Sequence, residues 1–170
     1  MKKAKILTAS LLTALTMTMA PVTALAFNLP FANQTQKEES YTFKSGLTEI
    51  KMGDEAATVI AALGQTTKAV FETDSCAYQG KDKVYTYKDF EVSTFPKDGK
   101  ECISALVITG ANVATPEGIS VGSKASDVTR IYGTSDGKYG IYRYDKGHSE
   151  LTFYTDAAGS VEEIEYIYKQ

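Results

Sequence analysis

The chain has 170 residues, with 18 basic and 21 acidic side chains and a formal net charge of −3. Nucleic acids and anionic membranes bind clustered Lys and Arg, so this balance argues against both as partners. The length suffices for one compact domain and is short for two independent ones.

The N-terminal segment has the pattern of a secretory signal peptide. Three lysines among the first five residues precede an uncharged run that ends at Pro21, and Ala24-Leu25-Ala26 supplies a small-x-small cleavage site. The alternative is a retained membrane anchor, but the run is shorter than the roughly 20 residues that span a bilayer. We therefore predict a signal peptide in residues 1–26, a polar disordered leash in residues 27–40, and a bacterial protein that is secreted or extracytoplasmic and free of the membrane after cleavage.

Two stretches of the chain are nearly the same. Residues 50–64 return, with substitutions, as residues 119–133. A repeat of this kind is a whole supersecondary unit, so the sequence predicts two copies of one plan. We place the first copy in residues 41–118 and the second in residues 119–170, which together form one compact domain.

Each copy begins with a short amphipathic helix. Four apolar residues of the first copy share one helix face by their spacing: Ala56, Val59, Ile60 and Leu63. The second copy keeps the pattern with Ala125, Val128 and Tyr132. We expect Asp54 and Ser123 to cap the two helices, and Gly64 and Gly133 to end them.

After each helix come three runs rich in Tyr, Val, Ile, Phe and Thr, separated by turn residues. The runs correspond between copies: 84–87 with 141–144, 91–95 with 150–154, and 106–108 with 164–166. In the third pair, Leu106, Ile108, Ile164 and Tyr166 are expected to face the helices, with Val107 and Glu165 on the other side. The prediction is an α+β fold of two tandem repeats, each a short helix plus an antiparallel β-meander, with the helices on one sheet face and the other face open.

Two strings carry a family resemblance: Thr115-Pro116-Glu117-Gly118-Ile119-Ser120-Val121-Gly122 with Val128 and Tyr132-Gly133, and Ile50-Lys51-Met52-Gly53 with Val59 and Leu63-Gly64. They resemble the tandem repeats of the β-lactamase inhibitory protein-like fold, one unit of which occurs in small outer-membrane assembly lipoproteins. The resemblance implies a secreted or envelope protein that binds other proteins through an exposed concave sheet face. The chain departs from the inhibitors by having one cysteine pair in place of one per repeat, and no tryptophan.

A second resemblance rests on Ser75-Cys76-Ala77-Tyr78 and Gly80-Lys81-Asp82-Lys83-Val84-Tyr85, which are similar to strings in secreted proteins of Gram-positive bacteria. It implies no activity. Cys76 and Cys102 are the only cysteines, and in an exported chain they most simply form one structural disulfide. The alternatives are a redox pair, which the spacing disfavours because it is unlike Cys-x-x-Cys, and free thiols.

Catalytic and metal-binding patterns are missing from the sequence. His148 is the single histidine, and it lies in what reads as a hairpin turn next to Ser149, whose side chain would point to the opposite strand face. The acidic residues do not follow a calcium-loop pattern, and no Cys or His cluster exists. We expect no enzyme activity, no metal and no cofactor.

Tyrosine is the remaining candidate for function. Tyr85 and Tyr87 share a strand face, as do Tyr142 and Tyr144. Either these rings cover the core on the helix-facing side of the sheet, or they lie on the open face, where aromatic rings with a polar hydroxyl suit a protein interface. The predicted binding residues are Tyr85, Tyr87, Phe95, Tyr142, Arg143, Tyr144 and Tyr154, with a solvated strand position as the alternative for Arg143. The predicted function is a non-catalytic binding module for an extracellular or envelope protein or peptide, and the alternative is a glycan or small-ligand binder that uses the cleft between the repeats.

Overall fold

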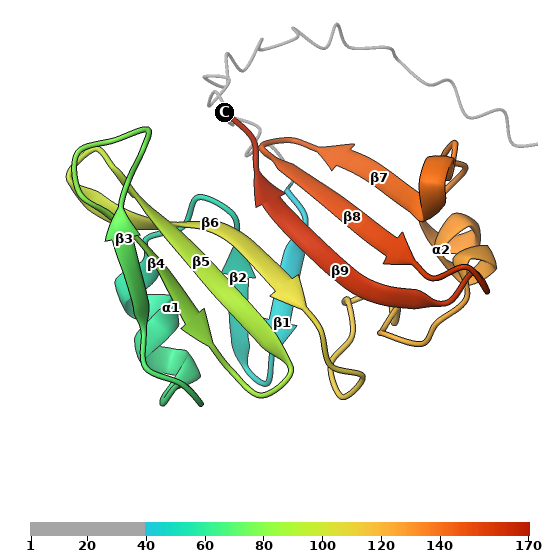
Figure 1. Ribbon diagram of the computed structural model, residues 1–170, viewed down its shortest axis with the longest axis horizontal. Coiled ribbons are helices and arrows are strands. Elements are labelled where there is room, and N and C mark those ends of the chain that lie inside the picture. The colour runs from blue at the N-terminus through green and yellow to red at the C-terminus, as the bar shows by residue number, and fades with distance from the viewer. Residues whose placement is uncertain (1–39) are drawn as a thin grey trace, which may run out of the picture. The chain divides into compact units, whose positions relative to one another are not determined.

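The computed structural model describes residues 40–170, which lie within one compact unit. The predicted signal peptide, and the predicted leash apart from residue 40, fall outside the described residues. No helix between residues 40 and 170 is long and apolar enough to cross a membrane. The described chain has an α+β fold with two helices, a seven-stranded sheet and a separate two-stranded hairpin (Figure 1).

The large sheet is antiparallel throughout, and all six predicted strands belong to it. Its spatial order is β3 (Phe71–Asp74), β4 (Lys81–Thr86), β5 (Phe90–Lys97), β6 (Lys100–Ile108), β9 (Val161–Tyr168), β8 (Ser149–Thr155) and β7 (Ile141–Lys146). The meander β4–β5–β6 follows the first helix and the meander β7–β8–β9 follows the second. Pairing of β6 with β9, from Ala105 opposite Ile167 to Ile108 opposite Ile164, joins the two meanders into one continuous surface.

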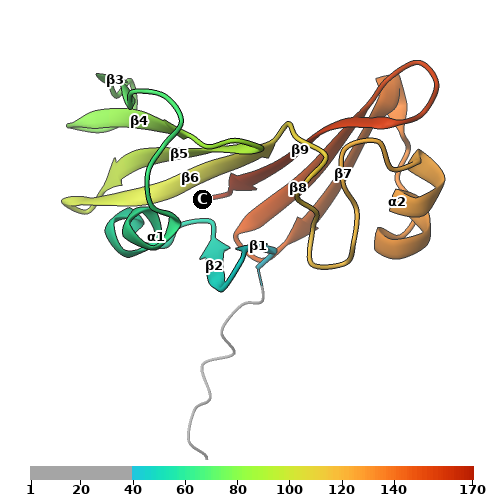
Figure 2. The ribbon, with the colours of Figure 1, turned by 90° about the horizontal axis from the view of Figure 1, so that it is seen from below.

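One face of the sheet is covered by the helices α1 (Ala56–Leu63) and α2 (Ala125–Tyr132) and by the hairpin of β1 (Thr42–Ser45) and β2 (Thr48–Lys51) (Figure 2). Phe43 and Ile50 of the hairpin are fully buried against this face. The predicted helix-facing side chains of the third strand pair are confirmed, since Leu106, Ile108 and Ile164 have no exposed surface and Tyr166 has 1%. The core therefore lies between the sheet and this layer.

Helix ends were only partly predictable. Gly64 and Gly133 end the helices as expected, with φ of 77° and 97° that a residue without a side chain adopts at no steric cost. The predicted caps were wrong, because Glu55 and Lys124 occupy the cap positions and neither makes a side-chain capping bond. The Asp54 carboxylate accepts from the Lys51 amide at 3.3 Å, and the Ser123 hydroxyl from the Ser120 amide at 3.1 Å, so both stabilise the preceding turns.

Three elements had no counterpart in the sequence-based prediction: the β1–β2 hairpin, the edge strand β3 and the 3-10 turn Lys138–Gly140. The hairpin nevertheless had a signal, because Phe43 and Ile50 alternate with polar neighbours around the Gly46 turn. Strand β3 has no such signal, since all four of its residues are exposed.

Candidate binding face

The second face of the sheet carries no helix or hairpin of the described chain (Figure 1). We call it the open face and define it by two rows of directly paired residues and by Tyr154 and Glu163. The first row is Val84, Ser93, Ala105, Ile167, Glu150 and Asp145, and the second row is Thr86, Glu91, Val107, Glu165, Thr152 and Arg143. Side chains at directly paired positions project to the same side, so these residues share one surface.

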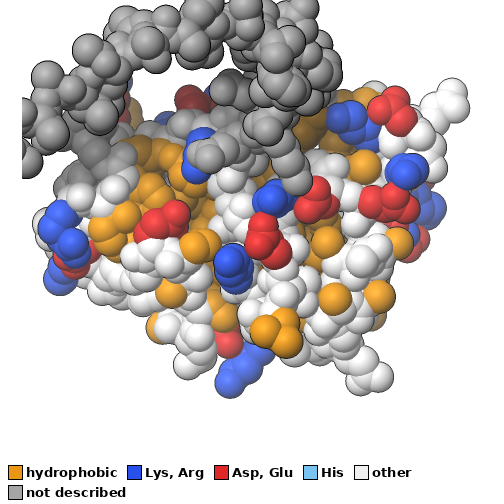
Figure 3. All heavy atoms as spheres, turned by 180° about the vertical axis from the view of Figure 1, so that it is seen from behind, with side chains coloured by type: hydrophobic (Ala, Val, Ile, Leu, Met, Phe, Trp, Pro, Cys, Tyr) orange, Lys and Arg blue, Asp and Glu red, His pale blue; other side chains and the backbone are white. Residues whose placement is uncertain are grey.

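Most of the charged residues that define the open face are acidic. At the β7 edge of this face the carboxylates are paired with basic side chains. Arg143 Nε lies 3.7 Å from Glu150 Oε1, and Lys169 Nζ lies 2.5 Å from Asp145 Oδ1. In the middle, Glu91, Glu163 and Glu165 form no ion pair within the described chain. Glu91 accepts a hydrogen bond from Thr86 at 2.9 Å, and Glu165 accepts one from Tyr154 at 2.8 Å. The opposite side of the molecule differs, because acidic and basic side chains are interspersed there (Figure 3).

The charged form of Glu163 is disfavoured in the folded protein. Burial, followed by the charges of Glu165 and Glu162, raises the pKa of Glu163 above its ordinary value. A raised carboxyl pKa means that the folded protein disfavours the charged form. A positive group brought to this part of the open face would favour that form.

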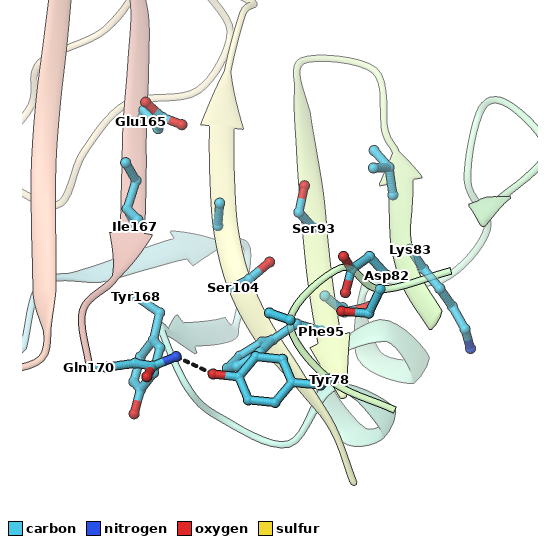
Figure 4. Close-up of a pocket in the computed structure, with 15 residues that line it drawn as sticks. Tyr78, Asp82, Lys83, Ser93, Phe95, Ser104, Glu165, Ile167, Tyr168 and Gln170 are labelled. Atoms are coloured by element: carbon cyan, nitrogen blue, oxygen red, sulfur yellow. Dashed lines mark hydrogen bonds between the residues drawn. The ribbon is translucent and has the colours of Figure 1, made fainter. Parts of the chain in front are cut away.

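The open face is hollowed over β4, β5, β6 and the end of β9, where a cavity of about 430 Å³ opens (Figure 4). The connection between β3 and β4, residues 75–80, forms one wall, and Phe95 lies between Tyr78 and Tyr168 with ring centroids 5.4 Å and 5.6 Å away. The Gln170 side-chain amide donates to the Tyr78 hydroxyl, which links the connection to the C-terminus. A bulge between β5 and β6 turns both Ser104 and Ala105 toward the cavity.

Polar groups of the cavity include two without partners. Asp82 Oδ1 and Ser75 Oγ are both buried at the atomic level, and neither forms a hydrogen bond within residues 40–170. Lys83 also lines the cavity, but its ammonium is 2.8 Å from Glu101 and its side chain extends away from the aromatic residues (Figure 4). The cavity thus combines an aromatic wall with an uncompensated carboxylate.

The structure divides the predicted binding residues between the two faces. Phe95, Arg143 and Tyr154 lie on the open side, where Arg143 is exposed and Phe95 lines the cavity. The four paired tyrosines lie on the helix-facing side and pack against the core: Tyr85, Tyr87, Tyr142 and Tyr144. Of the two interpretations of the Tyr-x-Tyr spacing, their position corresponds to the one in which the rings roof the core.

Specific contacts hold these tyrosines. Tyr87 stacks on Phe90 at 4.9 Å, and Tyr144 donates to the Gly133 carbonyl at 3.0 Å. Burial raises the pKa of Tyr87 and of Tyr144 above the ordinary value of a tyrosine hydroxyl. Sequence reasoning named Tyr78 and Asp82 only within the two strings similar to secreted proteins of Gram-positive bacteria, and it did not single them out as site residues.

The prediction of a disulfide between Cys76 and Cys102 is wrong for this structure. Cys76 and Cys102 are both free thiols in the structure, Cys76 exposed and Cys102 buried. The physical reason lies in how residues 75–80 contact the sheet. Cys102 is paired with Phe95 across β5 and β6, and the side chain that reaches Phe95 from the connection is Tyr78, while Cys76 faces solvent.

His148 lies in the turn between β7 and β8, as expected, with its ring centroid 6.4 Å from that of Tyr168. The neighbouring Ser149 hydroxyl is fully buried, donates to the Lys146 carbonyl at 2.9 Å and accepts from the Tyr41 amide at 2.8 Å. This hydroxyl has a structural role, because it ties the β1 segment to the turn. Among the described residues, no group of three or more His, Cys, Asp or Glu side chains is placed to hold a metal ion.

Comparisons with known proteins assign no family. No protein-family model matches the chain, and no curated protein matches it. A solved structure of an extracellular protein containing a SCP domain from Bacillus anthracis str. Ames aligns with a TM-score of 0.41 and 13% sequence identity. The alignment covers 69% of this chain and 44% of that chain, so this chain spans less than half of its length. The resemblance to the β-lactamase inhibitory protein-like fold therefore stays a prediction.

Proposed function

We propose that this protein is a secreted, non-catalytic binding module that captures a protein or peptide on the open face. The observation that carries the proposal is the asymmetry of the sheet: one side is buried under two helices and a hairpin, and the other presents a hollowed, acidic surface. Exposed sheet faces of this kind, with aromatic residues in a depression, suit recognition of another chain. The tandem-repeat organisation belongs to the same proposal, since joining two helix-plus-meander units edge to edge creates a surface that neither unit has alone.

The contact residues in this proposal differ from the predicted set. Phe95, Arg143 and Tyr154 remain, because their side chains lie on the open side. Tyr78 joins them from the cavity wall. The four tyrosines of the helix-facing side pack against the core on the other side of the sheet, so they do not contact the partner.

A matched pair of tryptophan substitutions tests the proposal. Peptides are selected from a displayed random library on the immobilised protein, and their affinities are remeasured on Ala105→Trp and Ala61→Trp. Ala105 lines the cavity, whereas Ala61 is exposed on α1, on the covered side. We expect the first variant to lose binding at least tenfold and the second to retain it, with circular dichroism showing that both are folded. Equal affinities for both variants, or no selected peptide, would refute binding on the open face.

A further inference from the structure

The cavity of the open face has the chemistry of a site for a positively charged side chain. Its inner surface provides two buried oxygens without donors, Asp82 Oδ1 and Ser75 Oγ. A carboxylate oxygen that is shielded from water and lacks a donor is unfavourable, and a ligand N–H would satisfy it. Both oxygens belong to residues that line the same cavity.

The charges around the cavity point to a cation. Asp82 and Glu165 line it, and neither forms an ion pair within the described chain. Lys83, which also lines it, is engaged by Glu101 at 2.8 Å and Glu72 at 3.8 Å. The cavity therefore presents uncompensated negative charge next to the central carboxylates of the open face, an arrangement complementary to a cationic ligand.

The aromatic wall specifies the shape of that ligand. Tyr78, Phe95 and Tyr168 form a continuous set of rings, which favours an alkyl stem and also attracts a cation over a ring face. The Tyr168 ring already has a cation of the chain: Lys97 Nζ, which does not line the cavity, lies 4.6 Å from the ring centroid and 2.6 Å from the hydroxyl. The rings left for a ligand are therefore those of Tyr78 and Phe95. An aliphatic stem ending in a cation matches both the wall and the carboxylate.

We propose that this cavity binds a lysine or arginine side chain of the captured protein or peptide, with the cation at Asp82 and Ser75 and the stem against Tyr78 and Phe95. The inference rests on the proposed function, because it names the residue by which a partner is anchored on the open face. A neutral sugar ring would also stack on the aromatic wall, but it would leave the charge of Asp82 and Glu165 uncompensated.

The test is a titration followed by NMR on the ¹⁵N-labelled protein. The probes are Nα-acetyl-lysine amide, its norleucine analogue, which keeps the stem and lacks the ammonium, and the disaccharide of N-acetylglucosamine. Probes of roughly a dozen heavy atoms bind weakly, so we expect a Kd in the millimolar range for the lysine probe. The shifted amides should lie in residues 75–80 and in β5 and β6, and the norleucine probe should bind at least tenfold more weakly.

Two variants with the same loss of charge complete the test. Asp82→Asn removes the cavity carboxylate, and Glu162→Gln removes an exposed carboxylate of β9 that does not line the cavity. We expect the first to weaken lysine binding at least tenfold and the second to change it less than twofold. If Asp82→Asn does not fold, Ala105→Trp serves in its place, because it fills the cavity without changing charge.

The outcomes separate this inference from the proposed function. Equal binding of the lysine and norleucine probes, unchanged binding to Asp82→Asn, shifts outside the cavity, or binding of the disaccharide alone would each overturn the inference. Selected peptides that need a free Ala105 surface but carry no basic residue would also overturn it, while the proposed function would stand. A lysine probe that enters the cavity when no peptide is captured would leave the preference of the cavity for a cation intact, but it would remove the proposed function and with it the role of the cavity as an anchor for a captured chain.

Discussion

Replacing Glu101 by glutamine removes a charge on which three side chains converge. Lys83 Nζ donates to Glu101 Oε2 at 2.8 Å, and the hydroxyls of Tyr85 and Thr94 donate to Oε1 at 2.8 Å and 2.7 Å. These residues belong to three neighbouring strands, β4, β5 and β6. Glutamine has the same shape and keeps an oxygen for the two hydroxyls, but it turns an amide toward the Lys83 ammonium.

The expected loss follows from the environment of this cluster. Thr94 is 1% exposed, and the Lys83 and Glu101 side chains are 26% and 28% exposed, so the cluster is only partly screened by water. Hydrogen bonds to charged groups contribute about 1.5–3 kcal/mol when shielded, and exposed ion pairs about 0.2–1 kcal/mol. We expect Glu101→Gln to lower the free energy of unfolding by about 1–1.5 kcal/mol. Glu101→Ala should lower it by about 3 kcal/mol, because the buried Thr94 hydroxyl then loses its acceptor.

The effect should depend on pH in a definite direction. Burial pushes the pKa of Glu101 up, but hydrogen bonds from Lys83, Thr94 and Tyr85 outweigh it, so the pKa lies below its ordinary value. The unfolded chain then binds the proton more readily than the folded one. The stabilisation is fully present above the unfolded pKa of about 4.3 and is lost as the pH falls through the folded pKa.

Urea unfolding followed by far-ultraviolet circular dichroism, at pH 7 and at low pH, measures this difference. Glu55→Gln is the matched control, because Glu55 lies 2.8 Å from Lys100 but in a pair with side chains 51% and 63% exposed. Its expected cost is below about 0.5 kcal/mol. A Glu101→Gln variant within 0.3 kcal/mol of the wild type at pH 7, or a difference that persists below the folded pKa, would refute this account of the cluster.

Three further predictions concern other parts of the described chain. Tyr144→Ala should lower the free energy of unfolding in urea by about 2–3 kcal/mol, because the Tyr144 ring packs against the core. The control Tyr139→Ala should lower it by less than about 0.5 kcal/mol, since Tyr139 is 86% exposed. Equal losses in the two variants would contradict the placement of Tyr144. Glu163→Gln should raise stability at pH 7 by a few tenths of a kcal/mol. Burial and neighbouring carboxylates raise the pKa of Glu163, so the gain should fade as the pH falls through that pKa and the wild-type carboxyl becomes neutral; a gain that grows toward low pH would be inconsistent. With a thiol reagent, Cys76 should react at once and Cys102 only on unfolding; a protein in which neither reacts before reduction would contain the disulfide that the structure lacks.

The fold was predictable where side-chain alternation was strong. In β9, Ile164 and Tyr166 alternate with Glu163 and Glu165, and this pattern alone gave the strand and its buried side. Alternation in the Tyr-x-Tyr strands predicts less, because it indicates that two rings share a sheet face but not which of the two faces they occupy. That choice is made by the paired strand: Tyr144 lies opposite Leu151, which is fully buried, so Tyr144 faces the core as well.

The candidate cavity was beyond sequence reasoning because its parts meet only through the tertiary fold. Tyr78 lies in a connection with no periodic pattern, and it reaches Phe95 and the C-terminal residue Gln170 only because β6 and β9 pair at the centre of the sheet. The bulge that turns Ser104 toward the cavity is equally invisible in a sequence, since an extra strand residue has no fixed composition. The wrong disulfide has the same origin, because cysteine spacing does not report which side chain of a connection faces the sheet.

The acidic open face connects stability with binding. The raised pKa of Glu163 shows that the folded protein holds this carboxylate at a cost, and the cost comes from burial and from the charge of Glu165 and Glu162. A cationic ligand on the open face would stabilise the charged form of Glu163 and lower its pKa, so binding would release a proton wherever the free carboxyl is partly protonated. By linkage, the affinity for such a ligand must then fall as the pH is lowered through this pKa, whereas the affinity for a neutral sugar would not follow the titration. The negative charge of Glu163, which is unfavourable in the free protein, thus favours a cationic partner over a neutral one.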